Sequence, residues 1–125
     1  MKRIVHTDKA PKAVGPYSQA VEIGGTLYIS GQIPINPDTG VIVEGGIVEQ
    51  TEQVLRNIQA ILNEAGYTLL NVVKTTVLMQ DLNDFSAMNA VYARYYVEHQ
   101  PARSTFQVAK LPMGVQIEIE TVAVK

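Results

Sequence analysis

Apolar residues recur at helical spacing between Ile47 and Ala65, and this pattern predicts the longest element of the chain. Gly66 follows directly, where a glycine commonly ends a helix in the left-handed conformation. A second helical pattern begins after Asn83 or Asp84, either of which can cap it, and Pro101 stops it. The apolar positions of this second helix are Phe85, Met88, Val91, Tyr92 and Tyr95.

Runs rich in β-branched residues predict strands on both sides of these helices. Tyr17 to Ile23 and Thr26 to Ser30 are joined by Gly24-Gly25, a pair that supplies positive φ in a tight hairpin. The run Asn71 to Gln80 predicts a central strand. One face of that strand would carry Val73, Val77 and Met79, and the other Lys74 and Thr76.

The closing strands are expected at Arg103 to Val108 and Val115 to Val124, and a short first strand at "RIVH". The order is then β-β-β-α-β-α-β-β, which predicts one α+β domain over residues 1–125 with a mixed sheet of about six strands. Two helices can cover only one face of such a sheet. Self-association is the simplest way to cover the other face.

Composition narrows the classes of function. The formal charge is -2, from 10 basic and 12 acidic residues, and no basic stripe occurs that would favour a nucleic-acid or membrane partner. The absence of cysteine excludes disulfides and thiolate catalysis. No apolar run suits a signal peptide or a membrane span, so we expect a cytoplasmic protein.

Charged residues interrupt the last two strands. Arg103 and Thr105 share one strand face, and Gln116, Glu118 and Glu120 share one face of the last strand. If these strands were neighbours, a guanidinium and a carboxylate could meet over one cleft. An arginine can grip a substrate carboxylate, and a glutamate beside it can take a proton from water. The alternative is structural: solvated edge charges, or an ion pair that ties the strands together.

Other motifs point away from cofactor and metal chemistry. The chain has no GxGxxG, GxxxxGK[ST], GxSxG or HExxH motif, and His6 and His99 are too far apart in sequence to suggest a metal site. No cofactor is therefore expected. Tyr17 in "GPYS" and Ser30 in "SGQIP" stand beside turns at strand ends, where binding groups are common.

Several separated motifs resemble the YjgF/Rid family of reactive-intermediate deaminases, and the match extends over nearly the whole chain. They are "APKAVGPYSQAV", "SGQIPINPDTG", "VVKTTVLMQDLNDF", "MNAVYARYY", "PARSTFQVAKLP" and "IEIETVAV". The resemblance implies a chorismate-mutase-like fold assembled as a homotrimer, with ligand clefts between subunits. It also implies hydrolysis of 2-imino acids such as 2-iminobutanoate and 2-iminopropanoate to 2-oxo acids and ammonia, which removes reactive imines and enamines.

The resemblance also assigns roles to particular residues. It implies that Arg103 grips the substrate carboxylate and that Glu118 orients the attacking water. Thr105 stands where deaminating members of the family often have cysteine, in "PARSC". Further pocket positions implied by the resemblance are Tyr17, Ser30, Gly31 and Asn89.

Two other functions remain open at this stage. A regulatory trimer could bind 2-oxo acids in a cleft where an arginine holds the carboxylate, without catalysing any reaction. A ribonuclease or translation inhibitor is also associated with the family, although an acidic chain without a basic stripe suits that role less well.

Overall fold

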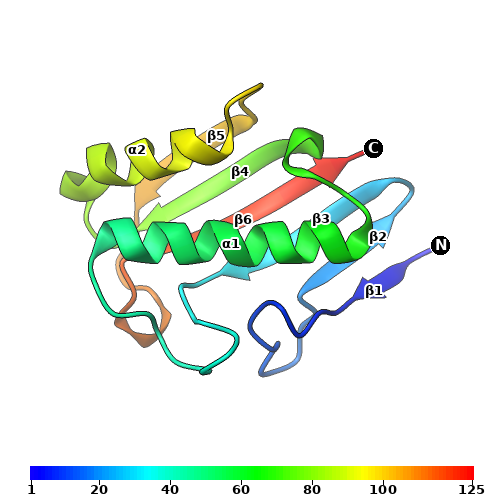
Figure 1. The fold of residues 1–125 in the computed structure, drawn as a ribbon, viewed down its shortest axis with the longest axis horizontal. Coiled ribbons are helices and arrows are strands. Elements are labelled where there is room, and N and C mark those ends of the chain that lie inside the picture. The colour runs from blue at the N-terminus through cyan, green and yellow to red at the C-terminus, as the bar shows by residue number, and fades with distance from the viewer.

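Two helices lie on one face of a single six-stranded sheet, as Figure 1 shows in a computed structural model that describes all of residues 1–125. The strands follow the spatial order β1-β2-β3-β6-β4-β5. Only β4 and β5 run parallel, and the other neighbours are antiparallel. The elements are β1 (Arg3–Val5), β2 (Ala20–Ile23), β3 (Thr26–Gln32), α1 (Ile47–Ala65), β4 (Val72–Met79), α2 (Phe85–Tyr95), β5 (Ala102–Gln107) and β6 (Ile117–Val124), with short 3-10 turns at Leu69–Asn71, Leu82–Asp84 and Pro112–Gly114.

The predicted α+β class, element order and first hairpin are confirmed. Helix α1 has the bounds that its apolar spacing predicts, and Gly66 ends it at φ 83°. Gly24 and Gly25 both have positive φ, 55° and 78°, as a two-residue turn between β2 and β3 requires.

One local expectation was wrong. The pairing of β4 with β6 shifts register between Val72 and Lys74, so Val73 is an inserted residue that leaves the core face. Val72 is buried in its place, and Val73 is exposed. Asp84 occupies the N-cap position of α2, as one of the two expected alternatives, but its side chain makes no capping hydrogen bond. The Asp81 side chain accepts from the Asn83 amide and caps the 3-10 turn that leads into the helix.

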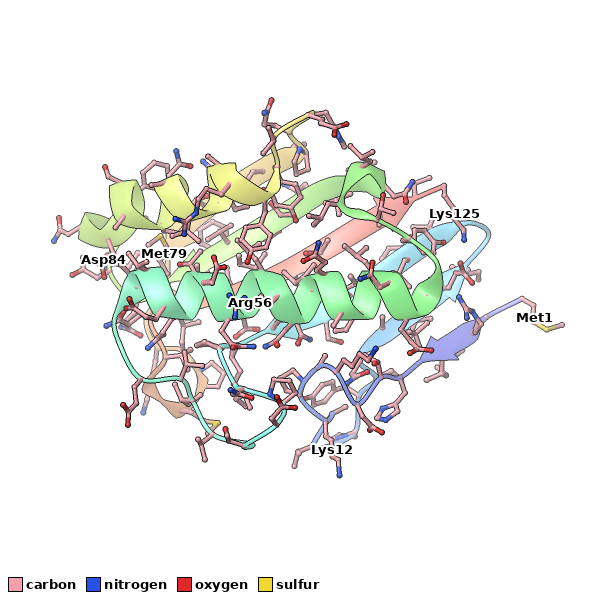
Figure 2. The ribbon with its side chains drawn as sticks, in the orientation of Figure 1. Met1, Lys12, Arg56, Met79, Asp84 and Lys125 are labelled. Carbon is pink, nitrogen blue, oxygen red and sulfur yellow. The ribbon has the colours of Figure 1, made fainter.

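The core lies between the helices and the sheet, where Figure 2 shows side chains filling the space behind α1. From β6 it takes Ile117, Ile119 and Ala123, whereas Glu118, Glu120, Val122 and Val124 alternate onto the other face. That second face carries exposed Tyr28 and Phe106 and no helix. Neither of the two helices has the length and apolar content needed to cross a membrane.

Candidate active site

Glu118 is a half-buried carboxylate on the uncovered face of the sheet. Burial raises its pKa above the usual range of a glutamate, and the negative charge of Glu120 raises it further. No arginine or lysine forms a salt bridge with it. A carboxyl group with a raised pKa can both accept and return a proton closer to neutral pH.

Gly31 makes room for this carboxylate. A Cβ placed on Gly31 would overlap the Glu118 Oε2 atom, so no larger residue fits without moving Glu118. Gly31 lies in a β-bulge, because the pairing of β3 with β6 shifts between Ile29 and Gln32. The bulge therefore brings the backbone of β3 close to the carboxylate.

Ser30 precedes Gly31 in the same bulge and holds the preceding loop. Its hydroxyl donates to the Ser18 carbonyl at 2.6 Å, and its amide donates to the Gln19 carbonyl at 2.9 Å. The loop held in this way carries Tyr17. Ser30 lies inside β3, two residues before its end, rather than at the strand end that the sequence predicted, and the structure gives its hydroxyl a partner within the chain.

Three loops at one end of the sheet surround Glu118 and enclose a cavity of about 880 Å³. These loops lie together along one edge of the molecule in Figure 1, and Lys12 marks the first of them in Figure 2. The cavity brings together Tyr17, Ser30, Gly31 and Glu118, as expected from the sequence. Its other lining residues are Lys12, Val14, Ile33, Ile35, Gly40, Pro112, Met113 and Glu120.

Arg103 lies on the opposite face of the sheet, beneath α2. Its Nη1 atom donates to Asn89 Oδ1 at 2.8 Å, and its guanidinium lies 4.7 Å from the centre of the Tyr92 ring. The Phe85 ring centre is 5.5 Å away. These contacts fix the orientation of the guanidinium. Arg103 and Asn89 both line a cavity of about 490 Å³, which is separate from the Glu118 cavity.

The expectation that Arg103 and Glu118 meet over one cleft of the chain was wrong. Strand β4 lies between β5 and β6, so the two strands are not neighbours. Arg103 pairs with buried Thr75 on the helix face, while Glu118 pairs with Leu78 on the other face. The structural alternative of an ion pair between these strands is excluded by the same arrangement.

Thr105 follows Arg103 on the helix face, opposite Val77 in the parallel pairing. Its Oγ1 atom is buried and has no hydrogen-bond partner in the chain. A buried hydroxyl without a partner carries a desolvation cost. Thr105 lines neither the Arg103 cavity nor the Glu118 cavity of the single chain.

The sequence reasoning missed the loop residues that complete the Glu118 cavity. Lys12 is the one cation in its lining, and Met113 is an exposed apolar side chain there. Their only sequence signal is position, in "APKAVGPYS" and in "LPMG", next to motifs already singled out. No group of three or more His, Asp or Glu side chains that could hold a metal occurs in the structure.

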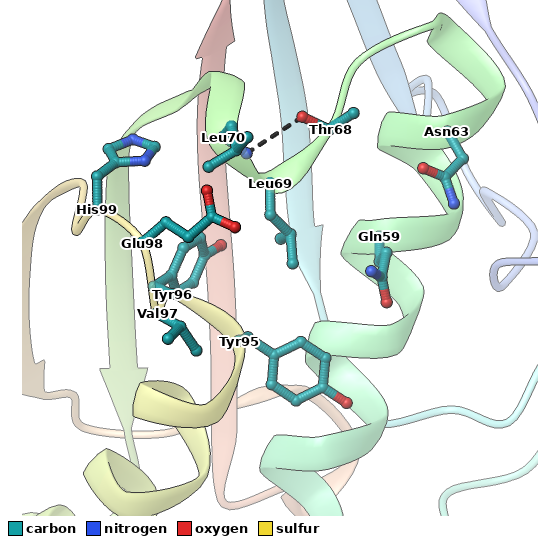
Figure 3. Close-up of a pocket in the computed structure, with 10 residues that line it drawn as sticks. All are labelled: Gln59, Asn63, Thr68, Leu69, Leu70, Tyr95, Tyr96, Val97, Glu98 and His99. Atoms are coloured by element: carbon teal, nitrogen blue, oxygen red, sulfur yellow. Dashed lines mark hydrogen bonds between the residues drawn. The ribbon is translucent and has the colours of Figure 1, made fainter.

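A further cavity of about 420 Å³ lies on the helix side, between the C-terminal half of α1 and the end of α2 (Figure 3). His99 borders it and contacts the Val72 carbonyl through Nε2 at 3.2 Å. This contact joins the segment after α2 to the start of β4. None of the predicted site residues lines this cavity.

Fold and site together define a class of protein: a small α+β domain with a half-buried carboxylate on the uncovered face of its sheet and an oriented arginine on the other face. A family model described as Endoribonuclease L-PSP matches residues 7–125. A RutC family protein of Pyrococcus horikoshii is 55% identical over 100% of this chain and 99% of its own. The human 2-iminobutanoate/2-iminopropanoate deaminase is 50% identical over 100% of this chain and 91% of its own.

A solved structure from Yersinia pestis, described as a member of the conserved Rid protein family, superposes with a TM-score of 0.98. It is 50% identical and is covered over its full length, as is this chain. The chain belongs to the YjgF/Rid family.

Proposed function

We propose that this protein hydrolyses 2-imino acids of the 2-iminobutanoate and 2-iminopropanoate type to 2-oxo acids and ammonia, in the cytoplasm and without a cofactor. The main observation behind the proposal is the environment of the Glu118 carboxyl group. It packs against Gly31 in a cavity that Tyr17 and Ser30 also line, and it forms no salt bridge with a cationic side chain. The identity of about half of the residues with the human deaminase supports the same reaction.

In the proposed mechanism Glu118 accepts a proton from water as the water oxygen bonds to the imine carbon. When the imine nitrogen is protonated, the product of this step is a neutral tetrahedral carbinolamine. The same proton is then returned to nitrogen, and the carbon–nitrogen bond breaks to release ammonia. The hydroxyl group gives its proton to the regenerated Glu118 carboxylate as the carbonyl forms. Because its pKa is raised, Glu118 is a stronger base than an ordinary carboxylate and keeps an accepted proton to higher pH than an ordinary glutamate does.

Two copies of the chain are needed to place the substrate carboxylate. Arg103 and Glu118 point away from opposite faces of one sheet, so we assign each site to Glu118 of one subunit and Arg103 of the partner subunit. The planar guanidinium can bind the carboxylate through two parallel hydrogen bonds, and Asn89 fixes its orientation. Thr105, next to the guanidinium on that face, would line the same cleft.

A homotrimer is the assembly we propose, with the uncovered sheet faces turned inward. Tyr28, Phe106 and Val124 are exposed on that face of a single chain, and Val122 and Leu78 lie between them. Exposed apolar side chains of this kind are stabilised when another subunit buries them.

Two alternatives compete with hydrolysis. A regulatory trimer would bind a 2-oxo acid through Arg103 and would not need a carboxyl group of raised pKa in the cavity. A ribonuclease, which the description of the family model suggests, would need a cationic surface for phosphates, whereas this chain has a net charge of -2.

The decisive experiment generates a 2-imino acid with an amino acid oxidase and measures its loss with and without this protein. Glu118→Gln keeps size and hydrogen bonding but removes the base, so the rate should fall roughly 10²- to 10⁴-fold. Arg103→Lys keeps the charge but loses the bidentate geometry, and should cost roughly 10- to 100-fold in kcat/KM.

Binding of a 2-oxo acid separates these variants. It should persist in Glu118→Gln and weaken in Arg103→Lys, while both variants keep the assembly of the parent protein. Normal hydrolysis by an intact Glu118→Gln protein would contradict the proposed mechanism, and binding without hydrolysis in the parent protein would favour the regulatory alternative.

A further inference from the structure

Met113 has an unusual backbone conformation at the edge of the Glu118 cavity. Its φ of 56° and ψ of 19° lie in the left-handed region, and it is the only residue other than glycine with positive φ in the chain. An L side chain is disfavoured there, and methionine has no short polar group that could compensate by a local hydrogen bond. Such strain concentrates at binding and catalytic sites.

The side chain of Met113 is exposed although it is large and apolar. Its exposed fraction is 68%, and it lines the same cavity as Glu118. Val14, Ile33 and Ile35 add apolar surface to that lining from two other loops. The half-buried carboxylate is therefore next to an apolar wall that a single chain leaves open to solvent.

We infer that Met113 is a specificity-determining residue, which contacts the side chain of the substrate and favours longer unbranched apolar side chains over a methyl group. The inference rests on the proposed function, because it assumes that the imine carbon lies at Glu118. A thioether side chain is flexible and adapts to apolar partners of different length. Each buried methylene favours binding by about fourfold.

The test compares three variants on a short and a long substrate. D-amino acid oxidase acting on D-alanine and on D-norleucine, with catalase present, supplies imino acids with a methyl and a butyl side chain. Met113→Asn introduces a residue that tolerates the left-handed backbone conformation, and it removes the apolar side chain. Met113→Leu restores apolar bulk. Leu70→Asn makes the same kind of change at a residue that is 55% exposed and outside the Glu118 cavity.

The quantity measured is the ratio of kcat/KM for the butyl substrate to that for the methyl substrate. Met113→Asn should lower this ratio about four- to sixteenfold, as expected for loss of contact with one or two methylenes. Met113→Leu should bring it back to within about twofold of the parent protein, and Leu70→Asn should leave it unchanged. Melting temperatures show whether each variant is folded.

Two results would overturn the inference in distinguishable ways. If both imino acids are hydrolysed and folded Met113→Asn keeps the parental ratio, Met113 has no part in specificity and the proposed function stands. If the parent protein hydrolyses neither imino acid, the proposed function fails and this inference fails with it.

Discussion

Glu118 is a carboxyl group whose ionisation is opposed by its surroundings. Burial is the larger cause and Glu120 the smaller, and both raise its pKa. Between the ordinary and the raised pKa the folded protein binds more protons at this site than the unfolded chain does. The free energy of unfolding therefore decreases as pH rises through this interval, and the loss remains at higher pH.

Glu118→Gln should consequently stabilise the protein near neutral pH while it abolishes most of the activity. The increase in melting temperature should be present at pH 7 and should disappear as pH is lowered past the ordinary pKa of a glutamate. Thermal unfolding at both pH values measures this. Glu98→Gln, which removes an exposed carboxylate on the helix side, controls for the change in net charge. An equal effect of Glu118→Gln at both pH values would show that ionisation of Glu118 carries no penalty.

At the scale of elements, the loop before β2 is held by one buried side chain. Gln19 accepts from the Thr7 amide at 2.7 Å and donates to the carbonyls of Thr7 and Pro11 at 2.9 Å and 2.8 Å. This anchoring positions the segment that carries Lys12 and Tyr17 into the Glu118 cavity. The loop is thus ordered by hydrogen bonds rather than by a secondary structure of its own.

Gln19→Leu should release that loop and leave buried backbone groups unpaired. We expect a loss of roughly 2–4 kcal/mol in the free energy of unfolding and a lower kcat/KM. Hydrogen exchange should accelerate in residues 7–19 and stay slow in β3 and β6. Gln53→Leu on α1, which removes one hydrogen bond to Asn57, is the matched control. Unchanged exchange in residues 7–19 of Gln19→Leu would mean that other contacts hold the loop.

At the scale of the whole molecule, the proposed assembly would make activity depend on Arg103 and Glu118 of neighbouring subunits, because the two groups lie on opposite faces of one sheet. A variant lacking one group can supply the other to a neighbouring subunit. Light scattering should therefore find a trimer of the 13.7 kDa chain, and an active protein should not exist as a monomer.

Mixing subunits tests this arrangement directly. Arg103→Lys should keep at most about a tenth of the parental activity and Glu118→Gln at most about a hundredth, but mixed trimers contain interfaces at which both groups are intact. If equal amounts assemble at random, about a quarter of the sites combine both intact groups, and activity should recover to about that fraction. Each variant unfolded and refolded alone is the control. Mixed trimers as inactive as their parents would place a complete site within one chain.

Much of the fold follows from local patterns in the sequence. The apolar spacing from Ile47 to Ala65 and the terminating Gly66 define α1 because helix formation depends on neighbours three and four residues apart. The glycine pair after Ile23 defines a hairpin for the same local reason. Val73 was assigned to the wrong face because a bulge depends on the partner strand, whose register the run of β-branched residues does not encode.

The sequence alone determines only part of the site. It determines that Arg103 and Thr105 share one strand face and that Glu118 and Glu120 share one face of another strand, since side chains alternate along any strand. Which of those faces the helices cover, and which strand lies between β5 and β6, is decided only by the tertiary structure. The physical reason is that strand order and facing are set by burial of the sheet against α1 and α2, through contacts between residues far apart in the chain.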